Sequence, residues 1–210
     1  MFHFAIPSVT TYRFILVIAA VLPAAFLMFR VYRSDRLEKE SPAMLWRLVK
    51  AGIFAALIAL VLERASEWLL ALFCREGSGV YDVILYLGVV ACSEEGANYF
   101  LMKRSTWRSP EFDCQYDGVL YAVFVSLGFA LWENVSYVMA YGFQTAILRA
   151  LTAIPGHGCF GVFMGVFYAF ARRSENAGAH QASKAFRILA VAIPVLLHGT
   201  YDYIASSGTG

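Results

Sequence analysis

The stretch FILVIAAVLPAAFLMF, residues 14–29, decides the fold class, because none of its side chains is charged. Its length approaches the ~20 apolar residues with which an α-helix crosses the hydrocarbon core of a bilayer. Hydrophobic residues make up 60% of the 210 residues, and charged residues only 15%. A soluble domain is usually about 45–50% apolar. The sequence therefore indicates an all-α membrane protein.

Five further apolar segments follow, each about as long as a membrane span. The six predicted spans are 12–32, 48–73, 79–102, 116–141, 145–171 and 185–206. They leave no room for a separate soluble domain, so we expect residues 1–210 to form one polytopic bundle of about six transmembrane helices. The first span is expected to act as a signal anchor and not as a cleaved signal peptide.

The basic residues are distributed unevenly between the two sides of this bundle. Thirteen of the 17 lie in the loops after the first, third and fifth spans: Arg30, Arg33, Arg36, Lys39, Arg47, Lys50, Lys103, Arg104, Arg108, Arg172, Arg173, Lys184 and Arg187. Only Arg13, Arg75 and Arg149 fall on the opposite side. Because positive loops stay in the cytoplasm, we predict a multi-pass protein of the cell membrane with both termini outside the cytoplasm.

Net charge and cysteine pattern exclude two other classes of protein. The formal net charge of +2 is too small to favour nucleic-acid binding. The four cysteines have no CxxC spacing, so neither a disulfide framework nor a cysteine-based zinc site is indicated. The lipid bilayer is the expected environment, and the oligomeric state cannot be read from the sequence.

Each of the last four spans contains polar residues at positions where a membrane span usually has apolar ones. They are Glu94, Glu95 and Asn98 in VACSEEGANYF (90–100), Glu133, Asn134 and Tyr137 in WENVSYV (132–138), His157 in IPGHGCFG (154–161), and His198 and Asp202 in LLHGTYDY (196–203). A charged side chain at the bilayer centre costs roughly 2.5–3.5 kcal/mol on insertion scales. These groups are therefore expected to converge on shared partners, water or a metal.

Helical spacing allows that convergence. Residues four apart share a helix face, which pairs Glu94 with Asn98, Glu133 with Tyr137, and His198 with Asp202. Neighbouring residues point about 100° apart, so one glutamate of the Glu94–Glu95 pair is expected to face the reacting centre while the other supports it. Two close carboxylates favour a base that works near neutral pH.

Other features have simpler explanations. Glu63, Arg64 and Glu67 are expected to form a local ion pair, and Gly161 and Gly165 a close helix contact. Taken singly, Asn98, Asn134 and Tyr137 are typical of hydrogen bonding between helices.

The order and spacing of these segments resemble the PrsW family of intramembrane proteases, within the larger group of CAAX prenyl endopeptidases and Abi-type proteins. The resemblance covers about residues 80–205. It rests on an EExxK-like motif at Glu94–Asn98, a DG…GF…EN…Y block (Asp117, Gly118, Gly128, Phe129, Glu133, Asn134, Tyr137), HxxxG (His157, Gly161) and HGxxD (His198, Gly199, Asp202). Asn98 stands where family members usually carry Lys. The resemblance implies cleavage of a membrane-tethered protein, an anti-sigma factor being the substrate that PrsW proteins are known for.

Peptide hydrolysis needs an activated water and donors for the oxyanion. We assign the base to Glu94 or Glu95 and the positioning of the water to His157. His198, oriented by Asp202, then serves as oxyanion donor or metal ligand, and Glu133 and Asn134 complete the polar cavity.

The metal dependence of this reaction is left open by the sequence. Zinc or another divalent metal would be held by His157, His198 and Glu133, the His₂Glu set of soluble metallopeptidases. The sequence has no HExxH motif that would require this choice, so a reaction without a metal is the other alternative.

A single-pass membrane protein is the expected substrate, approaching laterally past the glycines of the fourth and fifth spans. Two other functions use the same polar residues. A proton-coupled transporter or channel would use them as a relay, and a non-catalytic scaffold would use them as contacts between helices.

Overall fold

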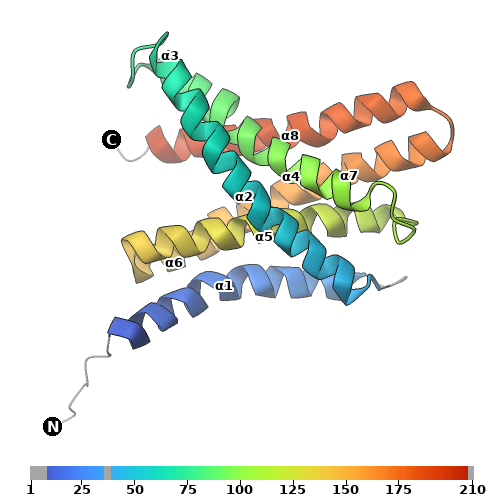
Figure 1. Ribbon diagram of the computed structural model, residues 1–210, viewed down its shortest axis with the longest axis horizontal. Coiled ribbons are helices and arrows are strands. Elements are labelled where there is room, and N and C mark those ends of the chain that lie inside the picture. The colour runs from blue at the N-terminus through green and yellow to red at the C-terminus, as the bar shows by residue number, and fades with distance from the viewer. Residues whose placement is uncertain (1–8, 36–38, 208–210) are drawn as a thin grey trace.

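The computed structural model describes residues 9–35 and 39–207, and within these ranges the chain is helical apart from short connections (Figure 1). Of the basic residues assigned to one side, Arg36 lies outside the described residues. The helices are α1 (Val9–Ser34), α2 (Pro42–Ala71), α3 (Gly79–Val83), the π-helix η1 (Ile84–Val90), α4 (Ala91–Thr106), α5 (Gln115–Tyr141), α6 (Phe143–Leu151), α7 (Ala153–Asn176) and α8 (His180–Ser207).

The expected polytopic helical bundle is confirmed, with two differences in its spans. Five helical stretches are long and apolar enough to cross a membrane. The predicted third span is helical from Gly79 to Thr106 but is divided into α3, η1 and α4. The predicted fifth span is not one helix, because α6 and α7 meet at Thr152, whose φ of −121° and ψ of −74° interrupt the helical backbone.

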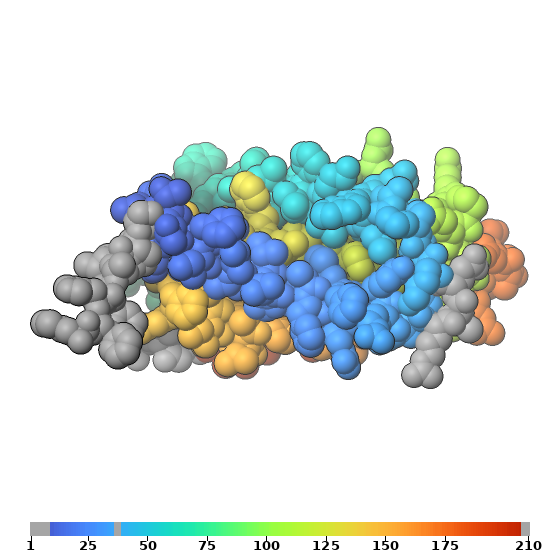
Figure 2. Space-filling view, turned by 90° about the horizontal axis from the view of Figure 1, so that it is seen from below, coloured from blue at the N-terminus to red at the C-terminus, as the bar shows by residue number. Residues whose placement is uncertain are grey.

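Helix α5 occupies the centre of the bundle. Of its most apolar window 72% is buried, against 22% to 39% for the other four stretches. The outward faces of the surrounding helices carry large exposed apolar side chains, among them Phe26, Phe54, Val61, Ile188 and Leu196. Figure 2 shows the face that α1 and α2 cover, with α5 visible between them. A buried centre with an apolar exterior is the pattern expected for a protein surrounded by lipid.

The basic residues collect at one end of the bundle. The ends of α1, α4 and α7 and the starts of α2, α5 and α8 lie together at the right of Figure 1. The start of α1 and the end of α8 lie at the opposite end. The predicted charge asymmetry therefore corresponds to the two ends of the folded bundle.

Close helix contacts depend on glycine. A Cβ atom on Gly165 of α7 would lie 2.4 Å from Val119 Cα of α5, and one on Gly161 would lie 2.9 Å from Val123 Cα. The GxxxG contact expected from the sequence is thus present. A Cβ atom on Gly128 would lie 2.5 Å from the Val49 carbonyl oxygen of α2. Neighbouring helices fill these three positions, so Gly128, Gly161 and Gly165 do not admit a substrate strand, contrary to the expectation for them.

Local sequence signals fix where the central helices begin and end. Ser41 caps α2 by accepting a hydrogen bond from the Met44 amide at 3.2 Å, with Pro42 in the first turn. Asp117 accepts a hydrogen bond from the Cys114 amide at 2.7 Å at the start of α5. Gly142 adopts φ +87°, a left-handed conformation that glycine tolerates, and this turns the chain from α5 into α6.

Candidate functional site

His198 of α8 lies at the centre of the polar cluster. Its Nδ1 is 2.8 Å from Glu95 Oε1, and its Nε2 is 3.3 Å from Asp202 Oδ2 and 3.8 Å from Glu94 Oε2. Helix α4 supplies both glutamates, directly after the π-helix η1. A π-helix has a wider turn than an α-helix and is frequent at functional sites. The two glutamates thus contact different nitrogens of the same imidazole, Glu95 at Nδ1 and Glu94 at Nε2.

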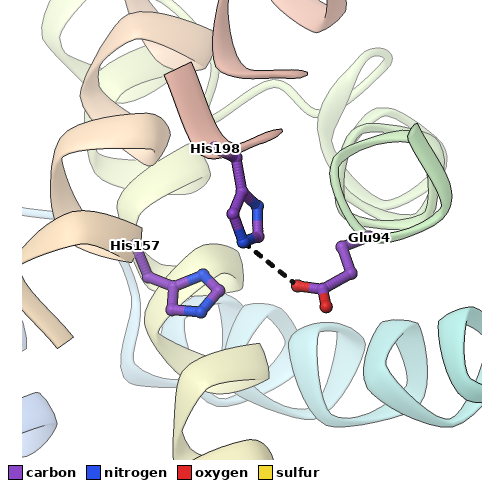
Figure 3. Close-up of side chains that lie close together, drawn as sticks. All are labelled: Glu94, His157 and His198. Carbon is purple, nitrogen blue, oxygen red and sulfur yellow. Dashed lines mark ion pairs between the residues drawn. The ribbon is translucent and has the colours of Figure 1, made fainter. Parts of the chain in front are cut away.

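His157 of α7 is the second imidazole. Its Nε2 lies 3.0 Å from Glu133 Oε2, and its ring centroid is 5.2 Å from that of His198. The Ser126 hydroxyl donates a hydrogen bond to the His157 carbonyl at 2.8 Å, which fixes the backbone here. Figure 3 shows Glu94, His157 and His198 pointing toward one another from three helices.

Arg149 of α6 holds Glu133 in place. Its Nη2 donates a hydrogen bond to Glu133 Oε2 at 2.8 Å, and its Nε donates one to Asn134 Oδ1 at 2.9 Å. The guanidinium carbon also lies 4.3 Å from the centroid of the Tyr137 ring. Asn134 donates a hydrogen bond to the Ala20 carbonyl at 2.7 Å, which links this group to α1. The carboxylate beside His157 is therefore neutralised by a cation that α6 brings in.

Several buried polar atoms of the cluster have no hydrogen-bond partner in the described residues. They include Glu94 Oε2, Glu95 Oε2 and His157 Nδ1. A buried polar atom without a partner is costly, so these atoms favour a ligand between them. Both amide atoms of the buried Asn98, one turn after Glu94, are also without partners.

The residues present fit a divalent metal. One ligand atom from each of Glu94, His157 and His198 lies within 4.8 Å of the others. Glu133 contacts Nε2 of His157 and leaves Nδ1 of that ring available. Glu95 contacts Nδ1 of His198, whose Nε2 faces Asp202 at 3.3 Å and Glu94 at 3.8 Å. Carboxylates that orient histidine ligands in this way are usual at zinc sites. The set differs from the expected one, because Glu94 takes the place of Glu133.

Two hollows adjoin the cluster. The larger has a volume of about 550 Å³ and reaches Glu94, Glu133 and Asp202 from a rim that includes Trp132 and Tyr137. The smaller, of about 190 Å³, reaches His157 and His198. Glu133, Arg149 and Asp202 line both hollows, so the reacting groups are reachable from two sides.

The structure brings together nearly all of the residues that the sequence singled out. Glu94, Glu95, His157, His198, Glu133 and Asp202 contact one another directly, Tyr137 lines the larger hollow, and Asn134 anchors Arg149. Asn98 is buried one turn after Glu94, and in the described residues its amide forms no hydrogen bond with the cluster.

Two residues were missed by the sequence argument. Arg149 was counted only for topology, although an ionisable residue inside a predicted span is itself a signal of function. The ion pair between Arg64 and Glu67 is confirmed at 3.1 Å, but Glu63 instead lines the larger hollow.

Comparisons with known proteins identify the family to which the sequence is similar. A sequence model described as PrsW family intramembrane metalloprotease matches residues 40–210. The chain is 29% identical to Protease PrsW of Bacillus subtilis (strain 168), over 92% of this chain and 84% of the relative. It is 31% identical to Protease PrsW of Shouchella clausii (strain KSM-K16), over 91% of this chain and 84% of the relative. No solved structure matches the chain.

Proposed function

This chain belongs to the PrsW family of intramembrane metalloproteases, and we propose that it hydrolyses a peptide bond of a membrane-tethered protein with a water activated at Glu94. One observation carries the assignment. Glu94 Oε2 and His157 Nδ1 are buried without hydrogen-bond partners, and His198 Nε2 lies 3.8 Å from that Glu94 oxygen. A water that accepts or donates hydrogen bonds at these atoms would satisfy them and lie ready for reaction.

Glu94 is the proposed proton acceptor. Its Oε2 takes a proton from the water while the oxygen of the water attacks the carbonyl carbon of the scissile bond. The same carboxyl group then returns the proton to the leaving amine. Glu95 is a poorer candidate, because its side chain is fully buried and its Oε1 lies against His198 Nδ1.

His198 is the proposed donor to the oxyanion. With Nδ1–H donated to Glu95 and with Asp202 3.3 Å from Nε2, a second proton on Nε2 is directed toward the same space as Glu94. A donor that is already positioned before charge develops on the carbonyl oxygen lowers the barrier without reorganisation.

His157 orients the water through Nδ1, and its ring is held by Glu133. Because Arg149 neutralises Glu133, the carboxylate can stay charged beside the imidazole at low cost. Arg149 and Glu133 are therefore positioning residues.

Glu94, His157 and His198 are also the residues that would hold a divalent metal, in which case they would act as its ligands instead of as proton acceptor, water-orienting group and oxyanion donor. When bound, such a metal supplies a Lewis acid that polarises the carbonyl and lowers the pKa of water.

The substrate and the orientation in the membrane are parts of the same proposal. A single-pass membrane protein, an anti-sigma factor among the candidates, reaches the larger hollow laterally past Trp132 and Tyr137. The basic end of the bundle faces the cytoplasm of the cell membrane, and both termini lie outside it.

Co-expression with tagged single-pass membrane proteins tests the function. Wild type yields a shortened product, whereas Glu94→Gln and His157→Ala yield none while still retaining the uncleaved protein in a pull-down. Product that persists in both variants would refute the mechanism. Ion flux that the variants lose, with no membrane protein shortened by any of the three chains, would favour the transporter alternative. No shortened product from any of the three chains, with equal retention of the membrane protein, would favour the scaffold.

A further inference from the structure

Three cations line one groove at the basic end of the bundle. The groove has a volume of about 470 Å³ and lies between α2 and α4. Arg47 and Lys50 of α2 face it across from Arg104 of α4. Residues three apart on a helix share a face, which explains why Arg47 and Lys50 project to the same side.

These cations lack acidic partners. Among the described residues, none of the three forms an ion pair with a carboxylate within 4.0 Å. Glu111 attracts Arg47 from a distance, but its Oε2 instead accepts a hydrogen bond from the Ser41 amide at 3.1 Å. Like charges gathered around one groove repel one another, so the groove favours an anion.

The rest of the groove is apolar and continues along the helices. Ala51, Phe54 and Leu101 line it beside the cations, and Phe54 is 61% exposed. Trp46, 67% exposed, lies one residue before Arg47 on the same end of α2. Exposed tryptophan is frequent at the level of lipid headgroups. The cations are therefore at headgroup depth, and the apolar wall lies on the side of the acyl chains.

We propose that this groove binds an anionic phospholipid, with its phosphate between Arg47, Lys50 and Arg104 and one acyl chain against Phe54 and Leu101. Basic pockets between transmembrane helices bind acidic headgroups in this way. A neutral peptide would leave the three charges unmatched. The inference does not depend on the proposed catalytic mechanism.

The bound lipid would hold together the helices that carry the reacting groups. Leu101 packs against a cluster in which alanines of α2 and α4, among them Ala55, Ala59 and Ala97, meet Phe129 of α5. Small residues bring the two helices close but provide little contact area. A phosphate that bridges Arg47 and Arg104 would fix their spacing at the end of α4, the helix of Glu94 and Glu95.

The test compares two triple variants of the full chain. The groove variant is Arg47→Gln/Lys50→Gln/Arg104→Gln, and the control is Arg33→Gln/Arg108→Gln/Arg173→Gln, which removes the same charge from exposed residues at the same end. Native mass spectrometry then counts phosphatidylglycerol and phosphatidylcholine that remain bound after extraction from mixed nanodiscs.

Wild type and control are expected to retain one phosphatidylglycerol in preference to phosphatidylcholine. The groove variant is expected to lose this preference by about a hundredfold, given about fivefold for each of the three basic residues near an anionic lipid. Equal loss in both triple variants, equal retention of the two lipids by wild type, or full retention by the groove variant would each overturn the proposal. If the groove variant does not fold, the single variant Arg104→Gln is compared with Arg108→Gln. Arg104→Gln is then expected to lower the preference for phosphatidylglycerol over phosphatidylcholine by about fivefold, and Arg108→Gln to leave it unchanged.

Discussion

Glu95 Oε1 lies 2.8 Å from His198 Nδ1, although the two residues are 103 positions apart in the chain. This contact gives different surroundings to two glutamates that are neighbours in the sequence. Glu95 is fully buried behind the imidazole, and Glu94 is left on the open side with an oxygen that has no hydrogen-bond partner.

The two glutamates should therefore respond differently to the same substitution. Glu94→Gln removes the proton acceptor and is expected to lower kcat by about 10²–10⁴-fold. Glu95→Gln keeps a hydrogen bond to His198 but removes the charge, with an expected loss of about 10–100-fold. Single-turnover cleavage of a substrate in nanodiscs measures both effects. An equal loss in the two variants would contradict the assignment.

Arg149 should matter for activity as well as for topology. Arg149→Gln leaves Glu133 without its cation and is expected to destabilise the fold by about 3 kcal/mol, because one partner of a mostly buried ion pair is lost. The kcat is expected to fall by about tenfold or more, since Glu133 loses the cation that holds it beside His157.

Two further variants control this prediction. Arg149→Lys keeps the charge but not the two-pronged contact to Glu133 and Asn134, so a partial rescue is expected. Arg75→Gln removes an exposed charge and should behave like wild type. Wild-type kcat in Arg149→Gln would show that Glu133 needs no partner.

The metal content of the purified protein should depend on Glu94, His157 and His198, the candidate ligands. Purified wild type is expected to carry one zinc or similar divalent ion per chain, measured by elemental analysis, and His157→Ala and His198→Ala to carry none. Asp202→Asn should retain the metal, because Asp202 lies outside this set. A metal-free chain with full activity would leave Glu94 as the only activator of the water.

Two glycines of α7 should differ in their tolerance of alanine. A Cβ atom at Gly165 would lie 2.4 Å from Val119 Cα, so Gly165→Ala must push α5 and α7 apart and is expected to cost about 1–3 kcal/mol. At Gly158 the nearest atom is a side-chain carbon of Leu27 at 3.7 Å. Gly158→Ala should be neutral or stabilise the helix by up to about 1 kcal/mol. Thermal unfolding in detergent measures both, and equal midpoints would contradict the close contact.

Glu40, in the connection before α2, should make stability depend on pH. Burial raises the pKa of this carboxyl from 4.5 to about 8, although the Tyr121 hydroxyl donates a hydrogen bond to it at 2.9 Å. The folded chain therefore binds a proton that the unfolded chain releases between these values, so stability falls as pH rises from about 4.5 to about 8.

Glu40→Gln removes this titration while keeping an acceptor for Tyr121. The free energy of unfolding of this variant should decline less than that of wild type between pH 5 and about 9. Parallel pH profiles of the two chains would show that Glu40 is ionised in the folded state throughout.

The sequence by itself determined that the chain is a membrane protein and where most of its spans lie. It also determined at which end the basic residues lie and which polar residues of the spans come together. These follow from local quantities, because hydropathy, charge and helical spacing act within a few turns. An isolated carboxylate in lipid is costly. A stable bundle is therefore expected to bring the ionisable side chains of the spans, Glu94, Glu133, His157 and His198, into contact.

Tertiary structure alone decided which atoms meet. Three features depend on how each helix is rotated and where it crosses its neighbours. They are the different contacts of Glu94 and Glu95, the place of Glu94 and not Glu133 among the candidate metal ligands, and the ion pair of Arg149 with Glu133. Those rotations are set by contacts such as Gly165 against Val119 and Gly199 against Leu87, together with the wider turns of η1 before Glu94. Such contacts join residues far apart in the chain, and no pattern within one helix specifies them.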